Sequence, residues 1–502
     1  MKIPYILVSA LLLSLAGCGG GGGDSTSPPP KTGQTNPTIV VPLTKLSTDT
    51  FTNATSQHAT EVEPSAASNG ATIVSAFQVG RISGGGAADI GFATSTNGGA
   101  TWTQGYLPGL TVNYQGGAFQ AASDPSVAYD AAHLAWMISS LALSNNGKVV
   151  VSRSLDGISW VPPVTVSTTN DADKEWITCD NTSSSPFYGH CYVMWDDPSV
   201  SGGRMFISVS NDGGQTWQAA KNTADLAAGI GVQPVVQPNG TVIVLTANNP
   251  SSTPISAILS FRSTDGGATW SATTTVSSVT QHQVAGGLRT EALPTAGIDS
   301  AGNVYVVWQD CRFRAGCASN DLVISTSADG LTWSSPARIP IDATSSAADY
   351  FIPGLAVEPG TSGTSAHLAL SYYFYPTANC TTSTCSLNIG FISSQDGGKN
   401  WSAAATLVTG MYLSSLPTTT DGPMVGDYIA TAYSNGHAFP FVAVANLPSG
   451  TTFDEAIYTT TSGLTAAAAH SGVNPEEAVV SSQSDRTTRR SVDLEGRYPK
   501  PR

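Results

Sequence analysis

STDGGATW, residues 263–270, is one of six copies of a short motif along this chain. The other copies are STNGGATW at 95, SLDGISW at 154, SNDGGQTW at 210, SADGLTW at 327 and SQDGGKNW at 394. Their tryptophans lie 53 to 68 residues apart. This spacing is typical of one four-stranded propeller blade with long loops rather than of a helical repeat. The repeat therefore predicts an all-β propeller.

The residues of the motif suit a covered tight turn. Asp or Asn followed by Gly favours a hairpin turn that needs positive φ, and the carboxylate can accept hydrogen bonds from backbone amides within that turn. The tryptophan then covers the turn. The first copy has Asn97 in place of Asp, but it keeps the Gly-Gly turn.

The six copies resemble the Asp box, S-x-D-G-G-x-T-W, of sialidase-like propellers. In that family the box lies between the third and fourth strands of a blade, on the face opposite the active site. The resemblance implies that the box aspartates are structural, so they are not candidates for catalysis.

The number of blades depends on the chain outside the boxes. After the sixth box, residues 427–433, 439–445 and 453–460 are expected to form three strands without a box. Residues 38–45 would supply the missing outer strand and close the ring, which removes exposed sheet edges. We therefore favour seven blades, six of them with Asp boxes, and six blades is the alternative.

Composition limits the class of protein. The chain has 502 residues, a formal net charge of −14, 11% charged residues and ten tryptophans. This acidic balance argues against a nucleic-acid binder, and coiled coils carry far more charge. With 40% hydrophobic residues the chain can bury a sizeable core. These values favour an extracellular, strand-rich protein.

The beginning of the chain predicts export and a lipid anchor. Residues 3–17 are apolar but too short to span a bilayer stably. They end in Leu-Ala-Gly before Cys18, which resembles the lipobox of bacterial lipoproteins; an ordinary secretory signal with a chance Cys is the alternative. Gly19 follows, which under the Gram-negative family rule implies the outer membrane or cell surface.

The chain divides into four parts on this basis. We expect a lipoprotein signal peptide and lipobox at 1–18, a Gly/Ser/Pro-rich tether at 19–37, the propeller at 38–465 and a disordered tail at 466–502. The only contact with a membrane is then the N-terminal lipid, and we expect a monomer.

The other six cysteines fall into three local pairs, which an exported protein would oxidise. The expected disulfides are Cys179–Cys191, Cys311–Cys317 and Cys380–Cys385. A metal site is disfavoured, because there is no C-x-x-C pair and the seven histidines are scattered. No motif for a cofactor or nucleotide is present.

Charged residues collect where a propeller would place them on the face opposite the boxes. Loops between strands two and three, and loops between blades, would place these charged and polar residues there: Arg81, Asp171, Asp173, Lys174, Glu175, Asp196, Asp197, His282, Arg289, Glu291, Asp310, Arg312, Arg314, Asp349, Tyr350, Asp421, Asp427 and Tyr428. A solvated or capping role remains the alternative for each. Asp310 and Arg312 stand two apart beside a predicted disulfide, so they would project to one side of an extended strand end.

The resemblance to sialidases carries over only in part. Sialidases use a Tyr nucleophile activated by Glu, an Asp acid/base and three Arg that hold the sugar carboxylate. Where sialidases have their first Arg, this sequence has Val62-Glu63-Pro64. Where they have the Asp, Gly80-Arg81 follows Val79 and no carboxylate is present. The remaining candidates are Asp310, Glu291 and Tyr350 for catalysis, with Tyr428 as the alternative nucleophile, and Arg81, Arg289 and Arg312 for substrate binding.

Two functional hypotheses follow. The first is an exo-acting glycoside hydrolase on terminal, sialic-acid-like sugars. The second is a surface-displayed, non-catalytic module that binds a glycan or a protein, which the missing Arg and Asp favour. A purely structural role in the cell envelope is the alternative to both. We expect a carbohydrate partner and no nucleic acid.

Overall fold

The computed structural model describes residues 33–467 except 145–146, 168, 170 and 249–253. Cys18, most of the predicted tether and nearly all of the predicted tail lie outside the described residues. Within the described part, antiparallel strands dominate, and the only helices are four short 3-10 turns. No helix in this part of the chain is long and apolar enough to cross a membrane.

In chain order the strands fall into seven successive antiparallel groups, most of them with four strands. The first four groups are β3 (Gln57–Asn69), β4 (Thr72–Arg81), β5 (Ala87–Ser95) and β6 (Thr103–Tyr106); β7 (Ala121–Asp130), β8 (Ala135–Leu143), β9 (Gly147–Ser154) and β10 (Trp160–Thr165); β11 (Asp173–Cys179), β12 (Cys191–Asp197) and β13 (Arg204–Ser210); β14 (Ile230–Val236), β15 (Val242–Ala247), β16 (Ala257–Ser263) and β17 (Thr274–Ser278).

The last three groups follow the same plan. They are β18 (Thr295–Ile298), β19 (Val304–Asp310), β20 (Asp321–Ser327) and β21 (Ala337–Arg338); β22 (Asp349–Val357), β23 (Leu368–Tyr375), β24 (Ser386–Ser394) and β25 (Ala405–Tyr412); and β28 (Ala430–Ser434), β29 (His437–Ala445) and β30 (Glu455–Thr460). A small hairpin, β26 (Thr418–Thr419) and β27 (Gly422–Pro423), precedes the last group. Pairing of β5 with β7 and of β3 with β30 joins the first, second and last groups into one larger sheet.

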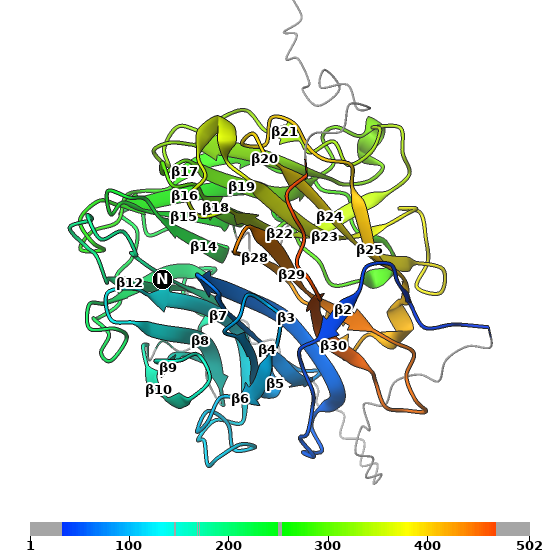
Figure 1. Cartoon of the computed structure of the whole chain (residues 1–502), viewed down its shortest axis with the longest axis horizontal. Coiled ribbons are helices and arrows are strands. Elements are labelled where there is room, and N and C mark those ends of the chain that lie inside the picture. The colour runs from blue at the N-terminus through cyan, green and yellow to red at the C-terminus, as the bar shows by residue number, and fades with distance from the viewer. Residues whose placement is uncertain (1–32, 145–146, 168, 170, 249–253, 468–502) are drawn as a thin grey trace, which may run out of the picture.

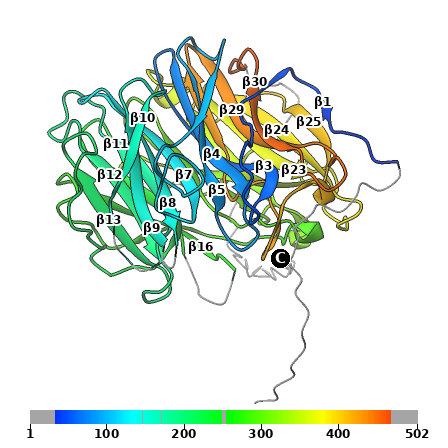
Figure 2. The same ribbon diagram turned by 90° about the horizontal axis from the view of Figure 1, so that it is seen from below.

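The first strands of the groups lie around the middle of the molecule (Figure 1). Each contacts the first strand of the next group, in the order β3, β7, β11, β14, β18, β22 and β28, and β28 contacts β3 again. Seen from below, groups such as β3–β5 and β7–β9 stand side by side as tilted sheets (Figure 2). Apolar residues pack between neighbouring groups. Trp195 of β12 is fully buried between the second and third groups, and Trp308 of β19 is fully buried between the fourth and fifth.

Residues 38–45, expected as one outer strand, form two. β1 (Thr38–Ile39) pairs with β25, and β2 (Leu43–Lys45) pairs with β30 as the outer strand of the last group. Pro42, which has no N–H to donate, separates them. The chain thus bridges the sixth and seventh groups.

All six Asp boxes begin at the last residue of a group's third strand. In the fourth copy Asp265 accepts hydrogen bonds from the Thr269 amide at 2.9 Å and the Ser263 hydroxyl at 2.8 Å. Asn97 accepts the equivalent amide bond from Thr101 at 2.9 Å. In these two boxes the Asp or Asn side chain therefore accepts the hydrogen bonds that hold the turn from within the box itself.

A two-residue β-bulge recurs in five of the first strands, each time opposite a single residue of the second strand. The first bulged residue has positive φ in every case: Glu63, Asp124, Lys174, Gly231 and Ile352. Four of these five residues are not glycine, although this conformation is costly for a side chain.

The three predicted disulfides are confirmed. Cα–Cα distances are 4.0 Å for Cys179–Cys191, 4.9 Å for Cys311–Cys317 and 5.0 Å for Cys380–Cys385. The last two pairs close short loops, whereas the first joins the paired strands β11 and β12.

Candidate functional site

Three carboxylates from three different groups surround one ammonium group near the middle of the ring. Lys174 Nζ lies 2.6 Å from Asp427 Oδ2, 3.1 Å from Asp124 Oδ2 and 3.7 Å from Glu63 Oε1. All four side chains are at least nine-tenths buried. We call these four residues, together with Arg289, the axial cluster.

Arg289 joins the axial cluster from the segment before β18. Its Nε donates to Asp427 Oδ1 at 2.8 Å, and one terminal nitrogen lies 2.5 Å from Asp427 Oδ2. This two-point pairing is the strong geometry for Arg and a carboxylate. Its other terminal nitrogen is 3.7 Å from the exposed Asp421. Through Arg289 and Asp421 the cluster reaches solvent.

The recurrent bulge is what brings the cluster together. Glu63, Asp124 and Lys174 are the bulged, positive-φ residues of β3, β7 and β11. Because these first strands are neighbours in the ring, the same local distortion aims three charged side chains at one point. Strained non-glycine residues of this kind concentrate at functional sites.

Burial and neighbouring charges shift the pKa values of two acids of the cluster, Glu63 and Asp427, in opposite directions. Burial, and then the Asp124 charge, raise the pKa of Glu63 to about 8. Burial would also raise the pKa of Asp427, but Lys174 and Arg289 outweigh it and hold that pKa well below its usual range. At neutral pH Glu63 is therefore protonated, whereas Asp427 is ionised.

A small cavity of about 140 Å³ lies beneath Asp427, along the first strands. Trp176, Gln233 and Tyr428 are among its lining residues. The Tyr428 hydroxyl donates to the Pro125 carbonyl at 3.0 Å, and its ring meets Trp176 edge to face. A polar-lined cavity of this size has room for several ordered waters.

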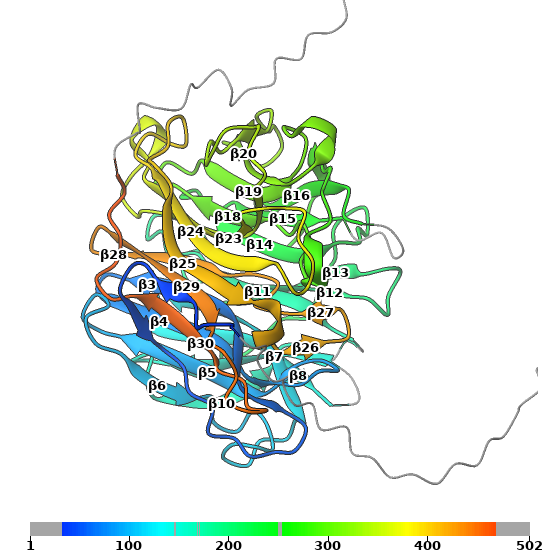
Figure 3. The same cartoon turned by 90° about the vertical axis from the view of Figure 1, so that its right-hand side faces the viewer.

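The β26–β27 hairpin lies beside the Arg289 segment, with Asp421 at its turn. Gln57 holds its first strand, accepting from the Thr418 amide at 3.0 Å and donating to the Thr418 carbonyl at 2.7 Å. The Arg289 amide donates to the Pro423 carbonyl at 2.9 Å. In the side view of Figure 3 the hairpin lies at the right, whereas β6, which follows the first Asp box, lies at the left.

Three of the six residues predicted for catalysis or substrate binding lie at or beside the axial cluster. Arg289 belongs to it. Glu291 is exposed nearby, and its pKa is raised by partial desolvation and then by Asp427. Arg81 is buried next to the cluster, where its guanidinium donates to the carbonyls of Ile82 and Gly86.

The other three predicted residues have different partners. Asp310 is fully buried at the end of β19 and accepts from the Arg312 backbone amide at 2.9 Å and its guanidinium at 2.6 Å. Arg312 also donates to the Ser278 carbonyl. Tyr350 is buried, and its hydroxyl donates to Asp342 at 2.7 Å. In the described residues no bond joins these three to the axial cluster, so the structure does not bring Tyr350 to Glu291.

Sequence reasoning did not single out Glu63 or Asp124. Both stand directly before a proline in a first strand, as Glu63-Pro64 and Asp124-Pro125. Ile352-Pro353 stands at the matching bulge of β22. A charged residue before the proline of a first strand was therefore the available signal.

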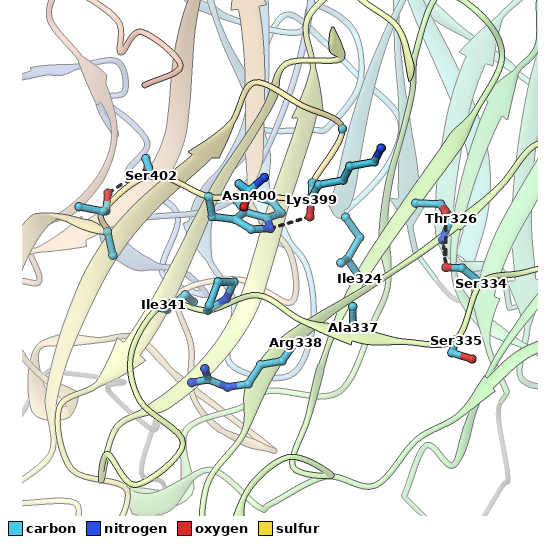
Figure 4. A pocket seen from close by; sticks show the side chains of 16 residues that line it. Ile324, Thr326, Ser334, Ser335, Ala337, Arg338, Ile341, Lys399, Asn400 and Ser402 are labelled. Carbon is cyan, nitrogen blue, oxygen red and sulfur yellow. Dashed lines mark hydrogen bonds between the residues drawn. The ribbon is translucent and has the colours of Figure 1, made fainter. Parts of the chain in front are cut away.

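A larger cavity than the one beside Asp427 lies between the fifth and sixth groups (Figure 4). Its volume is about 690 Å³, and small or hydroxyl side chains such as Ser334, Ser335 and Ala337 line much of it. Its buried cation, Arg338, is paired with Asp321 and Asp342. The axial cluster is the stronger candidate because its polar groups converge from several elements.

Among the described residues, no group of three or more His, Cys, Asp or Glu side chains is arranged to hold a metal ion. What the axial cluster offers instead is a protonated carboxyl group, ionised carboxylates and two cations, linked by N···O contacts of 2.5 to 3.7 Å. Such a set can transfer protons and stabilise charge.

Comparisons with known proteins agree with the repeat. The BNR/Asp-box repeat family matches residues 261–272, the fourth copy of the motif. No curated protein sequence matches the chain.

Several solved structures are similar to this chain. A Hadza microbial sialidase has a TM-score of 0.42 at 11% identity, covering 87% of this chain and 98% of its own. An ulvan lyase bound to a polysaccharide fragment has a TM-score of 0.49 at 10% identity, covering 87% and 100%. A protein of unknown function from Dyadobacter fermentans has 0.40 at 14% identity, covering 67% and 93%. Likenesses at this level do not bear on function.

Proposed function

We propose that this protein is a seven-bladed propeller that acts on a glycan as an exo-acting glycoside hydrolase. The glycan would bind at the exposed side of the axial cluster, formed by Arg289, Glu291 and Asp421, which we call the mouth. The observation that carries this proposal is the convergence of Glu63, Asp124, Lys174 and Asp427 from neighbouring strands, in a chain with only 11% charged residues. Ionisable groups with opposite pKa shifts in one site are typical of acid–base catalysis.

The ring of first-strand contacts supports seven blades. It runs from β3 through five further first strands to β28 and returns to β3. β2 then provides the outer strand of the seventh blade by pairing with β30. With six blades, the last group would have no place in this ring.

The chemistry assigned to the mouth needs two carboxyl groups in different protonation states. Glu291 is exposed and its pKa is raised, so it is the proposed proton donor to the departing oxygen. Asp427 stays ionised between Lys174 and Arg289, so its carboxylate is the proposed group that stabilises positive charge on the sugar or activates water. A terminal sugar at the mouth would sit above the small cavity, which suits exo action.

The test is turnover of a panel of fluorogenic glycosides by the full chain in detergent. Glu291→Gln should reduce kcat by at least about 100-fold, the usual contribution of a general acid. Glu358→Gln is the matched control, because Glu358 pairs with His367 away from the cluster. Turnover that survives Glu291→Gln unchanged would remove Glu291 from the mechanism.

A non-catalytic glycan-binding module is the second candidate. The pairing of Asp427 with both Lys174 and Arg289 favours it, because a carboxylate held this firmly is poorly placed to react. Binding of a glycan without turnover of any glycoside in the panel would select this candidate.

We also propose that the protein is exported as a monomeric lipoprotein, anchored through Cys18 at the bacterial outer membrane or cell surface. Three disulfides support an oxidising compartment. Cys18→Ser should abolish metabolic labelling by a fatty acid and release the protein from the membrane fraction. Labelling that persists in this variant would contradict the anchor.

A further inference from the structure

We propose that the mouth of the axial cluster takes an uncharged glycan and rejects carboxylated sugars, because the protein's own Asp427 and Asp421 occupy the cations that an acidic sugar would need. The inference rests on the proposed glycan site and names the substrate class of that site. It departs from the sialic-acid-like substrate that the sequence suggested.

The three cations near the axis are already engaged. Arg289 presents two donors to Asp427, at 2.8 Å from Nε and 2.5 Å from a terminal nitrogen. Lys174 lies within 3.1 Å of both Asp427 and Asp124. Arg81 donates to the backbone carbonyls of Ile82 and Gly86 in the loop between β4 and β5. The Asp427 carboxylate therefore stands where the carboxylate of an acidic ligand would bind.

Displacing Asp427 would be unfavourable. Its side chain is only 8% exposed, and its backbone amide also donates to Glu63 Oε1 at 3.1 Å. An incoming carboxylate would have to break the two-point pair with Arg289, which leaves Asp427 with Lys174 alone, a cation that Asp427 shares with Asp124. Buried carboxylates that lose one of their cations are destabilised.

The rim adds repulsion. Asp421, 68% exposed, stands 3.7 Å from the remaining terminal nitrogen of Arg289, and Glu291 is exposed nearby. An anionic sugar therefore meets the Asp421 carboxylate before it reaches the Arg289 cation. An uncharged sugar avoids this cost, and its hydroxyls can donate to Glu291 and Asp421. Asp421 is thus the proposed specificity-determining residue.

The experiment measures binding of the full chain in detergent to an array in which the same glycan cores appear with and without terminal sialic acid. We expect the bound members to be uncharged. Asp421→Asn should reduce the ratio of affinity for an uncharged core to affinity for its sialylated form about two- to fivefold, the size of effect expected for an exposed charge. Asp454→Asn, another exposed acid that pairs with Lys45, is the matched control and should leave the preference unchanged.

Each outcome separates this inference from the proposed hydrolase. Stronger binding of the sialylated member of a pair overturns the inference and leaves the hydrolase open. Binding of uncharged cores without turnover of any glycoside supports the inference and overturns the hydrolase. Absence of binding to every core overturns both.

Discussion

A single ammonium group, that of Lys174, lies within 3.7 Å of three carboxylates from three different blades of the proposed propeller. Nearly complete burial alone would lower the pKa of Lys174, but Asp124 and Asp427 more than compensate and raise it. The group is therefore charged at all ordinary pH values, and the carboxylates around it depend on that charge.

Lys174→Met should destabilise the protein by about 3–5 kcal/mol near neutral pH, because it leaves Asp124 and Asp427 buried without their shared cation. The loss should shrink at acid pH, where these carboxylates take up protons. Urea unfolding at several pH values measures it. Lys399→Met, at an exposed lysine, is the control. A loss below about 1 kcal/mol would mean that the cluster does not depend on Lys174.

At the scale of single elements, the Asp box can be tested by comparing its copies. Asp265 accepts bonds from an amide and two hydroxyls, and Asn97 accepts the same amide bond in the first box. Asp265→Asn should therefore cost little, whereas Asp265→Ala should cost about 1–2 kcal/mol, as for a lost turn or cap residue. Denaturant unfolding measures both. Equal losses would show that the carbonyl oxygen of the side chain is not what the turn requires.

Neighbouring first strands are joined by hydroxyl groups as well as by packing. The fully buried Ser126 of β7 accepts from the Ile177 amide of β11 at 3.2 Å. Ser126→Ala leaves that buried N–H without a partner and should cost about 1–3 kcal/mol. Ser335→Ala, at an exposed serine, should be silent. Slower amide hydrogen exchange at Ile177 in the variant would contradict this role.

For the whole molecule, the balance of buried acids predicts a fall in stability as pH rises. Burial raises the pKa of Glu61 and Glu63 to about 8, and that of Asp89 to about 7. Each binds its proton more tightly in the folded than in the unfolded state, so its contribution is complete below its unfolded pKa and lost as pH rises through its folded pKa. Asp427, with a lowered pKa, acts only in the acid range.

The midpoint temperature of thermal unfolding should therefore decrease as the pH rises from about 5 to about 9. Glu61→Gln keeps an acceptor for the Ser47 hydroxyl, which now donates at 2.7 Å, and should flatten the profile. Calorimetry across this range measures it. A midpoint that rises with pH would contradict the protonated state of these acids.

Much of the overall fold could be predicted from the sequence, because the Asp box is a local motif and its spacing counts the strand groups. The axial cluster could be predicted only in part. Loop charges such as Arg289 were found by their position after strands, but Glu63 and Asp124 reach the axis through bulges, and a bulge depends on register with the neighbouring strand. Asp310 and Arg312 do share one side of the chain, but there they pair with each other.

The most direct test of the central claim, that the axial cluster is the floor of a glycan site, is a crystal structure of the protein with the tightest-binding glycan of the array. The account predicts a sugar at the mouth, within hydrogen-bond distance of Glu291 or Arg289. A sugar bound instead in the large cavity between the fifth and sixth groups, with the mouth unchanged, would contradict it.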